Sequence, residues 1–307
     1  MCLGCLSFGD PGRGDHPWTL GLDQSRPIFR AAIEAGINFF DTANMYSDGS
    51  SEEILGALVR EYGRRDEVVI ATKVGVPGPD GAGLSRKAIV AAADGSLRRL
   101  GMDHIDLYQI HRLDPHVPFE ETLEALHDLV RAGKVRQLGA SSMHAWQFAK
   151  LLRTAERHGW TGFVGMQAQV NLIYREEERE MLPLCADEGV GVVAWSPVAR
   201  GRLSRPWGVG SGRAETDELS RILYDHCAAI DRPVVDALAA LAEVRGASMT
   251  CVALAWLLRR RGVAAALLGV TSVAQLEDAL TALDFPLSDA EVATLEAHYL
   301  PHPIAGF

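Results

Sequence analysis

Four side chains that can move a proton or stabilise charge stand at the ends of three apolar segments. Asp41 and Tyr46 follow the first segment, Lys73 ends the second, and His111 follows the third. A carboxylate, a phenol, an ammonium and an imidazole are typical groups of general acid–base catalysis. Each alone is more often structural, for example as a loop cap. Their order along consecutive segments favours a shared catalytic site.

The segments that carry these residues have the composition of buried strands. Seven apolar, β-branched runs are too short for helices and show no alternation, which is typical of parallel strands covered by helices on both faces. They span residues 37–40, 68–72, 105–110, 135–140, 163–167, 190–195 and 266–269, and residues 2–6 make an eighth run.

Segments with helical periodicity separate these runs, and a glycine follows each one where a left-handed residue ends a helix. They span residues 23–35, 50–62, 85–100, 119–132, 145–158 and 176–188, followed by Gly36, Gly63, Gly101, Gly133, Gly159 and Gly189. Two more helices are expected near residues 273–283 and 288–299, and Ser288 with Glu291 forms a capping box for the second.

Eight βα units predict an α/β protein with one domain over residues 1–307, a (β/α)8 TIM barrel with an extra C-terminal helix. In this fold, polar residues at the C-terminal strand ends form the active site. Residues 197–232 predict a long loop after the seventh strand, on the same face. The rival architecture, a doubly wound open sheet, usually carries a GxGxxG turn after its first strand. The early glycines, from Gly4 to Gly14, do not have that spacing.

Charge and hydropathy exclude several kinds of partner. The chain has 30 Lys and Arg against 40 Asp and Glu, a net charge of −10, which disfavours nucleic acid and anionic membrane surfaces. The longest apolar run, residues 263–270, is far shorter than the ~20 residues of a membrane span, and no secretion signal is evident. We therefore expect a soluble, cytoplasmic protein. The sequence leaves monomer and homo-oligomer open.

The cysteines also indicate a reducing compartment. They are Cys2, Cys5, Cys185, Cys227 and Cys251, an odd number dispersed through a long chain, which argues against a disulfide framework. Cys2 and Cys5 form a CxxC, but no second ligand pair follows. We expect structural roles for them and no metal site.

Several motifs resemble those of the aldo-keto reductases. They are residues 36–43 (GINFFDTA) with Tyr46, 49–56 (GSSEEILG), 71–73 (ATK), 106–108 (DLY) with His111 and Arg112, 133–136 (GKVR), 139–142 (GASS) and 195–197 (WSP). Within the family, residues 5–9 (CLSFG) and 174–180 (YREEERE) are most similar to the branch that includes aryl-alcohol dehydrogenase-like reductases. The resemblance covers nearly the whole chain and implies reduction of carbonyl compounds with a nicotinamide cofactor.

The resemblance implies a role for each of the four residues. Tyr46 is expected to be the general acid that protonates the carbonyl oxygen. A free phenol has a pKa of about 10, and a nearby ammonium, here Lys73 held by Asp41, favours the phenolate and eases release of the proton. His111 is expected to donate a hydrogen bond to the same oxygen and stabilise its developing charge.

The resemblance also implies which residues hold the cofactor. Ser141, Ser142 and Gln167, beside Asp41, are expected to bind the carboxamide, and Trp195 is expected to stack on the nicotinamide ring. The other expected contacts are Ser196, Pro197, Val198 and Gly201 around the pyrophosphate, and Gly269, Thr271, Ser272, Gln275 and Asp278 toward the adenosine.

Cofactor choice depends on a departure from the family pattern. After the eighth strand, relatives commonly place a Lys or Arg beside the 2′-phosphate, whereas Thr271, Ser272 and Gln275 are neutral. We expect NADPH, with NADH also possible, and a preference for NADPH under about tenfold. A larger preference requires an arginine from elsewhere, such as Arg202 or Arg213.

The expected substrate is a small carbonyl compound, aryl or otherwise hydrophobic, because Phe8, Trp18, Met45 and Trp207 stand near the expected rim. A second interpretation is a non-catalytic, nicotinamide-binding regulatory protein, like the potassium-channel β subunits that resemble this family. The four intact acid–base residues disfavour this interpretation.

Overall fold

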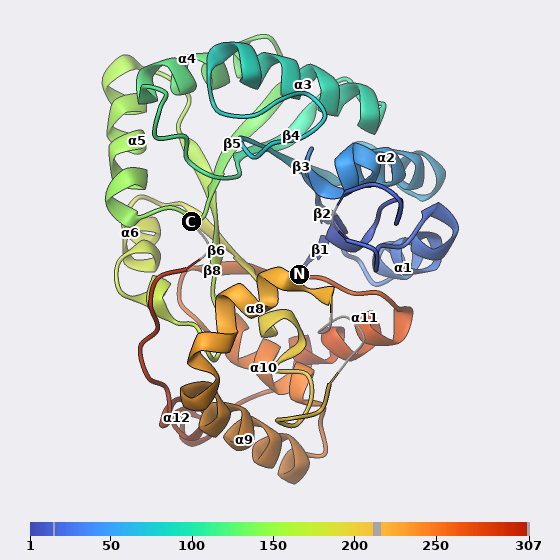
Figure 1. The fold of residues 1–307 in the computed structure, drawn as a ribbon, viewed down its shortest axis with the longest axis vertical. Helices are drawn as coiled ribbons and strands as arrows, with labels where there is room; N and C mark the ends of the chain where they lie inside the picture. The colour runs from blue at the N-terminus through green and yellow to red at the C-terminus, as the bar shows by residue number, and fades with distance from the viewer. Residues whose placement is uncertain (15, 211–215, 306–307) are drawn as a thin grey trace.

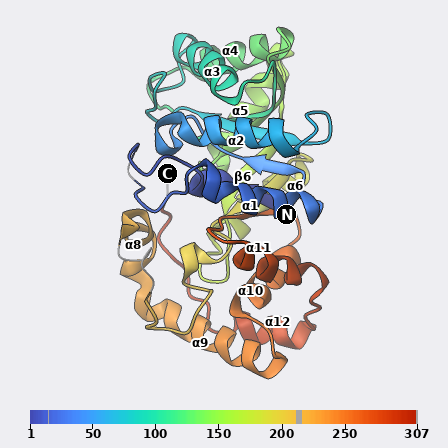
Figure 2. The ribbon, with the colours of Figure 1, turned by 90° about the vertical axis from the view of Figure 1, so that its right-hand side faces the viewer.

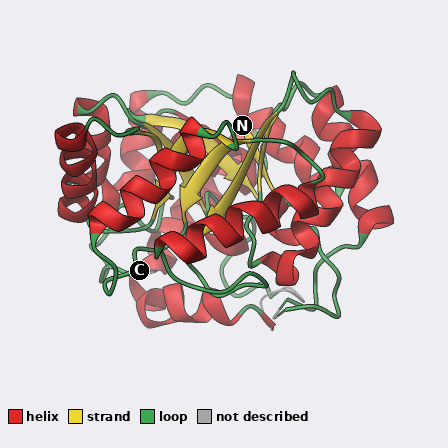
Figure 3. Cartoon of the chain, turned by 90° about the horizontal axis from the view of Figure 1, so that it is seen from above, coloured by secondary structure: helices red, strands yellow, loops and turns green. Residues whose placement is uncertain are grey.

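The computed structural model describes residues 1–14, 16–210 and 216–305. Eight parallel strands form a closed barrel in chain order, and β8 pairs with β1. Figure 3 shows the strands at the centre with helices around them. The strands are β1 (Cys2–Gly4), β2 (Phe39–Asp41), β3 (Val69–Val74), β4 (Ile105–Ile110), β5 (Val135–Ser141), β6 (Phe163–Gln169), β7 (Gly191–Trp195) and β8 (Val263–Leu268). The predicted (β/α)8 barrel is confirmed, and the open sheet is excluded.

Helices cover the outside of the barrel and extend it at one end, where α9, α10 and α12 lie together (Figures 1 and 2). They are α1 (Leu22–Glu34), α2 (Ser50–Tyr62), α3 (Arg86–Leu100), α4 (Phe119–Arg131), α5 (Ala145–His158), α6 (Met181–Asp187), α8 (Glu218–Tyr224), α9 (Ala228–Arg245), α10 (Met249–Leu258), α11 (Val273–Leu280) and α12 (Asp289–Glu296). The capping box of Ser288 and Glu291 begins α12 as predicted.

The structure corrects three expectations about helices. Residues 197–232 are not a loop throughout, since they contain α8 and the start of α9. No helix was predicted at α10, because nearly every residue of this helix is buried and a helix apolar on all sides has no polar stripe. The expected helix over residues 176–188 is a 3-10 turn (Glu176–Glu178) followed by α6.

Glycine ends most of the predicted helices in the left-handed conformation. Gly36, Gly101, Gly133, Gly159 and Gly189 all have φ between 64° and 82°. Gly63 is the exception, with φ −98° and ψ 147°, so the chain leaves α2 in an extended conformation.

Close packing of the outer helices holds the strands in register. A Cβ added at Gly56 on α2 would lie 2.1 Å from the carbonyl oxygen of Leu100 at the end of α3, so only glycine fits there. Beneath the helices, Leu3 on β1 and Phe40 on β2 are Cα partners and are fully buried, and Phe40 packs against Phe29 of α1. This packing fixes Asp41, the next residue of β2, at the C-terminal end of the barrel.

The remaining sequence predictions concern cysteines and membranes. All five cysteines are free and buried, and the described residues contain no His, Cys, Asp or Glu cluster suited to a metal ion. Among the described helices, none alone is long and apolar enough to span a bilayer. By length and composition only, the bent pair Glu218–Arg245 and Met249–Leu258 passes that test, with an angle of 104° between its helices.

Candidate active site

Asp41 and Lys73 form a buried ion pair at the C-terminal ends of β2 and β3. Both side chains are fully buried, and the Lys73 ammonium donates to Asp41 Oδ1. Burial opposes the charge of the Lys73 ammonium, but Asp41 and Tyr46 outweigh this effect and hold the Lys73 pKa above its ordinary value. The lysine is therefore a permanent cation beneath the site.

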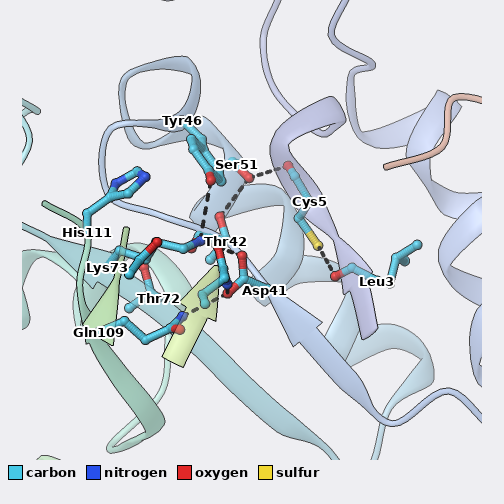
Figure 4. Close-up of polar contacts among 12 residues, drawn as sticks. Leu3, Cys5, Asp41, Thr42, Tyr46, Ser51, Thr72, Lys73, Gln109 and His111 are labelled. Atoms are coloured by element: carbon cyan, nitrogen blue, oxygen red, sulfur yellow. Dashed lines mark hydrogen bonds and ion pairs between the residues drawn. The ribbon is translucent and has the colours of Figure 1, made fainter. Parts of the chain in front are cut away.

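Lys73 also determines how Tyr46 is hydrogen-bonded. Its ammonium donates to the Thr42 carbonyl oxygen at 2.8 Å and to the Tyr46 hydroxyl oxygen at 3.3 Å (Figure 4). An ammonium has three donor hydrogens and no acceptor, so the tyrosine oxygen must accept. The phenol's own hydrogen is then available to a ligand in the cavity above.

His111 follows β4 beside this phenol. The two rings meet edge to face, with centroids 5.9 Å apart and an interplanar angle of 83°. Burial, with the nearby charges of Lys73 and Arg112, lowers the His111 pKa well below its ordinary value. The imidazole is thus neutral at physiological pH and carries one N–H donor and one acceptor nitrogen.

A pair of glutamines orients the Asp41 carboxylate. Gln109 and Gln167 both donate to Asp41 Oδ2, from Nε2 atoms at 2.8 and 2.9 Å. Gln109 is the Cα partner of Lys73 across β3 and β4, and of Gly139 across β4 and β5. A Cβ on Gly139 would lie 2.8 Å from Gln109 Cγ, so this glycine makes room for the amide that holds Asp41.

A cavity of about 440 Å³ opens above these groups. Asp41, Tyr46, His111 and Gln167 line it at the barrel end. Apolar walls come from Leu6, Met45, Val76, Leu219 and Leu267. The cavity therefore places a proton donor at the end of a mainly apolar space.

The expected aromatic rim is only partly present. Met45 lines the cavity, but Phe8, Trp18 and Trp207 are not among its lining residues. Phe8 is fully buried in the core, Trp18 stacks on His16 with ring centroids 4.9 Å apart, and Trp207 packs against the core. The sequence showed which residues were aromatic but not which way they pointed.

The residues expected around a nicotinamide lie together. Trp195 donates from Nε1 to Ser142 Oγ at 3.0 Å, and Ser142 Oγ is 3.3 Å from Ser141 Oγ. Ser141, Gln167 and Trp195 line the cavity, whereas Ser142 acts through the indole that it anchors. The Ser142 bond fixes the plane of the indole, and Gln167 keeps its carbonyl oxygen as an acceptor.

A second cavity, of about 490 Å³, continues from the first, and we call it the groove. The two share Pro197, Val198, Arg200 and Gly269, and Ser196 lines the first cavity only. The walls of the second cavity also include Gly201, Arg205, Thr271, Gln275 and Asp278. A mainly apolar cavity joined to a second one with small and polar walls fits an extended dinucleotide.

Ser272 and the expected arginines are placed differently. Ser272 is not on the groove wall, because its hydroxyl caps α11 by accepting from the Gln275 N–H at 3.3 Å. Arg202 is ion-paired with Asp225 and stacks over Tyr224, and Arg213 lies outside the described residues. Arg205, which sequence reasoning missed, is the arginine whose side chain lies against Gly201 on the groove wall.

Comparison with known proteins identifies the family. The model of the Aldo/keto reductase family matches residues 1–300. The chain belongs to this family. Among its relatives are an aldo-keto reductase of Alternaria alternata (42% identity over 99% of this chain and 89% of the relative) and the versiconal hemiacetal acetate reductase of Aspergillus parasiticus (41%, 99% and 94%). A protein of Schizosaccharomyces pombe provisionally named an aryl-alcohol dehydrogenase is also similar (40%, 100% and 93%).

Membership confirms the resemblance read from the motifs and supports an oxidoreductase acting on small carbonyl compounds. Aldo-keto reductases generally use nicotinamide cofactors, consistent with the two connected cavities.

Sequence reasoning missed two more polar groups that the barrel brings to this site. Gln109 stands two residues before His111, but its contact with Asp41 depends on strand register, which the sequence does not display. Arg200 lies in the turn after β7 and donates from Nε to both carboxylate oxygens of Asp217, at 3.0 and 2.8 Å. The only signal for that pair was the concentration of arginines in residues 197–232.

Proposed function

We propose that this aldo-keto reductase reduces aldehydes or ketones to alcohols, with Tyr46 as the general acid. The proposal depends on one observation, that the Lys73 ammonium donates to Asp41, to the Thr42 carbonyl and to the Tyr46 oxygen. This arrangement leaves the phenol proton for a ligand. When bound, the reduced nicotinamide supplies a hydride to the carbonyl carbon.

The side chains divide the remaining work. Tyr46 gives its proton to the substrate oxygen, and Lys73 stabilises the phenolate that remains. Asp41, held by two glutamine amides, keeps the lysine charged and in place. The neutral His111 ring donates its N–H to the same oxygen and stabilises the developing negative charge.

We propose NADPH as the cofactor, with Arg205 as the cation for its 2′-phosphate. Arg205 lines the same groove as Thr271 and Gln275, and no described carboxylate forms an ion pair with it. A guanidinium is suited to phosphate because its planar donors bind two oxygens at once. This proposal allows a larger preference for NADPH than the neutral loop alone predicts.

The test follows loss of NADPH absorbance with a panel of aromatic aldehydes. We expect turnover by the wild type and a loss of at least about 10²-fold in kcat for Tyr46→Phe, the range typical of lost general acid catalysis. Tyr62→Phe is the matched control, because it removes a phenol at the end of α2, outside the cavity. Near-normal kcat in Tyr46→Phe contradicts the role of Tyr46. Cofactor binding without turnover of any aldehyde favours the regulatory interpretation.

We propose the cytoplasm as the site of action. The five free, buried cysteines support a reducing compartment. Fractionation of the native cells, with reductase activity followed in each fraction, tests this assignment.

A further inference from the structure

The first cavity, which we call the substrate cavity, is lined by three charged side chains of the described residues. These side chains differ in their partners. Asp41 is neutralised by Lys73, and Arg200 is neutralised by Asp217, in a pair whose side chains are 6% and 1% exposed. The third is Arg112, which follows His111 on the loop after β4 and also lines the cavity. Arg112 differs from Asp41 and Arg200 in its ion-pair and hydrogen-bond partners.

Arg112 has no acidic partner among the residues that the structure describes. Its one hydrogen bond to a described residue runs from Nη1 to the His111 carbonyl oxygen, at 2.6 Å. No described carboxylate lies within ion-pair distance of it. Burial lowers the Arg112 pKa, and the nearby Tyr46 only partly opposes that effect. The guanidinium therefore brings an uncompensated positive charge to a protein whose net charge is −10.

Other arginines of the barrel form ion pairs with carboxylates. Arg99, between α2 and α3, pairs with both Glu52 and Asp80 at 2.6 Å. Arg136 on β5 pairs with Asp106 at 2.9 Å. Arg112 stands next to the catalytic His111 and lacks such a carboxylate within the described ranges, although desolvating an unpaired charge is costly. A ligand that enters the cavity can supply the missing anion.

We propose that Arg112 is an anion-binding residue of the substrate cavity, and that the preferred substrates are aldehydes or ketones that also carry a carboxylate. The inference rests on the proposed carbonyl reduction and names the substrate class for the same site. A guanidinium presents two parallel N–H donors that match the two oxygens of a carboxylate. Met45, Val76 and Leu219 line the same cavity and suit an apolar, aromatic body between the two polar groups.

The competing explanation is that Arg112 only fixes the backbone of His111 through its contact with the His111 carbonyl. In that case its removal would weaken turnover of every substrate by the same factor. Discrimination between charged and neutral substrates is therefore the informative quantity.

The experiment compares wild type and Arg112→Met with benzaldehyde, the 2-, 3- and 4-formylbenzoates, and the methyl esters of those acids as neutral matches. We expect the wild type to favour at least one formylbenzoate over its ester. For that acid, kcat/KM should fall about 10- to 100-fold in Arg112→Met, the factor that one charge-assisted hydrogen bond supplies. Benzaldehyde and the esters measure the loss that Arg112→Met causes for every substrate, so the test is the ratio of kcat/KM for the acid to that for its ester, and Arg112→Lys should recover part of the loss in that ratio.

Arg157→Gln is the matched control, since it removes one positive charge from the exposed end of α5. Equal losses for acids and esters, or a wild type that disfavours all three acids, would overturn the inference. Binding of the three hydroxymethylbenzoates, followed by tryptophan fluorescence in wild type and Arg112→Met, provides a readout without turnover. If no aldehyde is reduced, the proposed reaction fails, whereas Arg112-dependent binding of one acid would still support the anion site.

Discussion

The loops after the helices and the loops after the strands use the left-handed backbone region differently. At the helix ends of the described chain, every left-handed position is a glycine: Gly36, Gly101, Gly133, Gly159, Gly189 and Gly246. The loops after β2, β5 and β7 contain all the described non-glycine residues with positive φ: Ser47, Asp48, Ser142, Ser196, Ala199 and Arg200.

Each non-glycine residue in this region costs about 1–2 kcal/mol relative to ordinary backbone. Contacts of the site hold several of them in place. Ser142 Oγ accepts from Trp195, the Ser196 carbonyl accepts from Asn171 Nδ2 at 2.9 Å, and Arg200 pairs with Asp217. At the end of the barrel without the site, the left-handed positions after the helices are glycines and carry no strain. At the end with the site, non-glycine residues occupy such positions and are strained. Backbone strain here marks the face where ligands are handled.

The largest expected effects come from the end of the barrel that carries the site. Tyr46→Phe and Lys73→Met should each lower kcat by at least about 10²-fold. Because both act on one proton transfer, the double variant should lose little more than the worse single variant. Initial rates for the four proteins of the cycle test this, with far-UV circular dichroism to confirm folding. Losses that multiply would show that the two residues act independently.

The next effect concerns the loop after β7. Arg205→Gln should lower NADPH affinity about 10- to 100-fold and leave NADH affinity nearly unchanged, because only NADPH carries the phosphate that a charged donor binds. Fluorescence titration with both cofactors measures the two affinities. Arg221→Gln, on α8, is a control that removes a charge away from the groove wall. Equal affinity losses for both cofactors would place Arg205 beside a part that the two share.

A matched pair of substitutions tests the backbone comparison itself. Gly133→Ala, after α4, should reduce the free energy of unfolding by about 1–2 kcal/mol. Apart from the adjacent residues, no described atom lies within 4 Å of the new Cβ, so the cost is conformational. Asp48→Gly, at φ 51° in the loop after β2, should change stability by about 0.5 kcal/mol or less, because relief of strain is offset by a more flexible unfolded chain. Urea unfolding of both variants, with kcat measured alongside, compares the two ends. A larger loss for Asp48→Gly would contradict the assignment of strain.

The last expected effect is on the pH dependence of stability. In the folded protein the His111 pKa lies well below its ordinary value. Below pH ~6.5 the imidazole is therefore protonated in the unfolded chain but remains neutral in the folded chain. His111 therefore makes the protein lose stability as pH falls below ~6.5, by at most about 1.4 kcal/mol per pH unit. His111→Gln should flatten this part of the profile. Parallel profiles for wild type and variant would show that the ring titrates normally.

Particular residues show how much of the fold and the site could be predicted from the sequence. Local sequence patterns were sufficient to predict β4, α2 and α5, whose bounds in the structure match the predicted ones. The order of strands placed Asp41, Tyr46, Lys73 and His111 at one end, because every strand of a parallel barrel ends on the same side. Gln109, Arg200 and Arg205 could not be assigned, since their roles depend on strand register and on the path of the loop after β7. The extended exit at Gly63 was also not predicted.

The space left by Gly139 makes the placement of the Asp41–Lys73 pair depend on a residue outside the cavity. A single methyl group at this position would press on Gln109, whose amide holds the carboxylate that positions Lys73. Neither Gly139 nor Gln109 lines the substrate cavity. Small substitutions at Gly139 would thus change how the Asp41–Lys73 pair is held, while the surface that a substrate meets stayed the same.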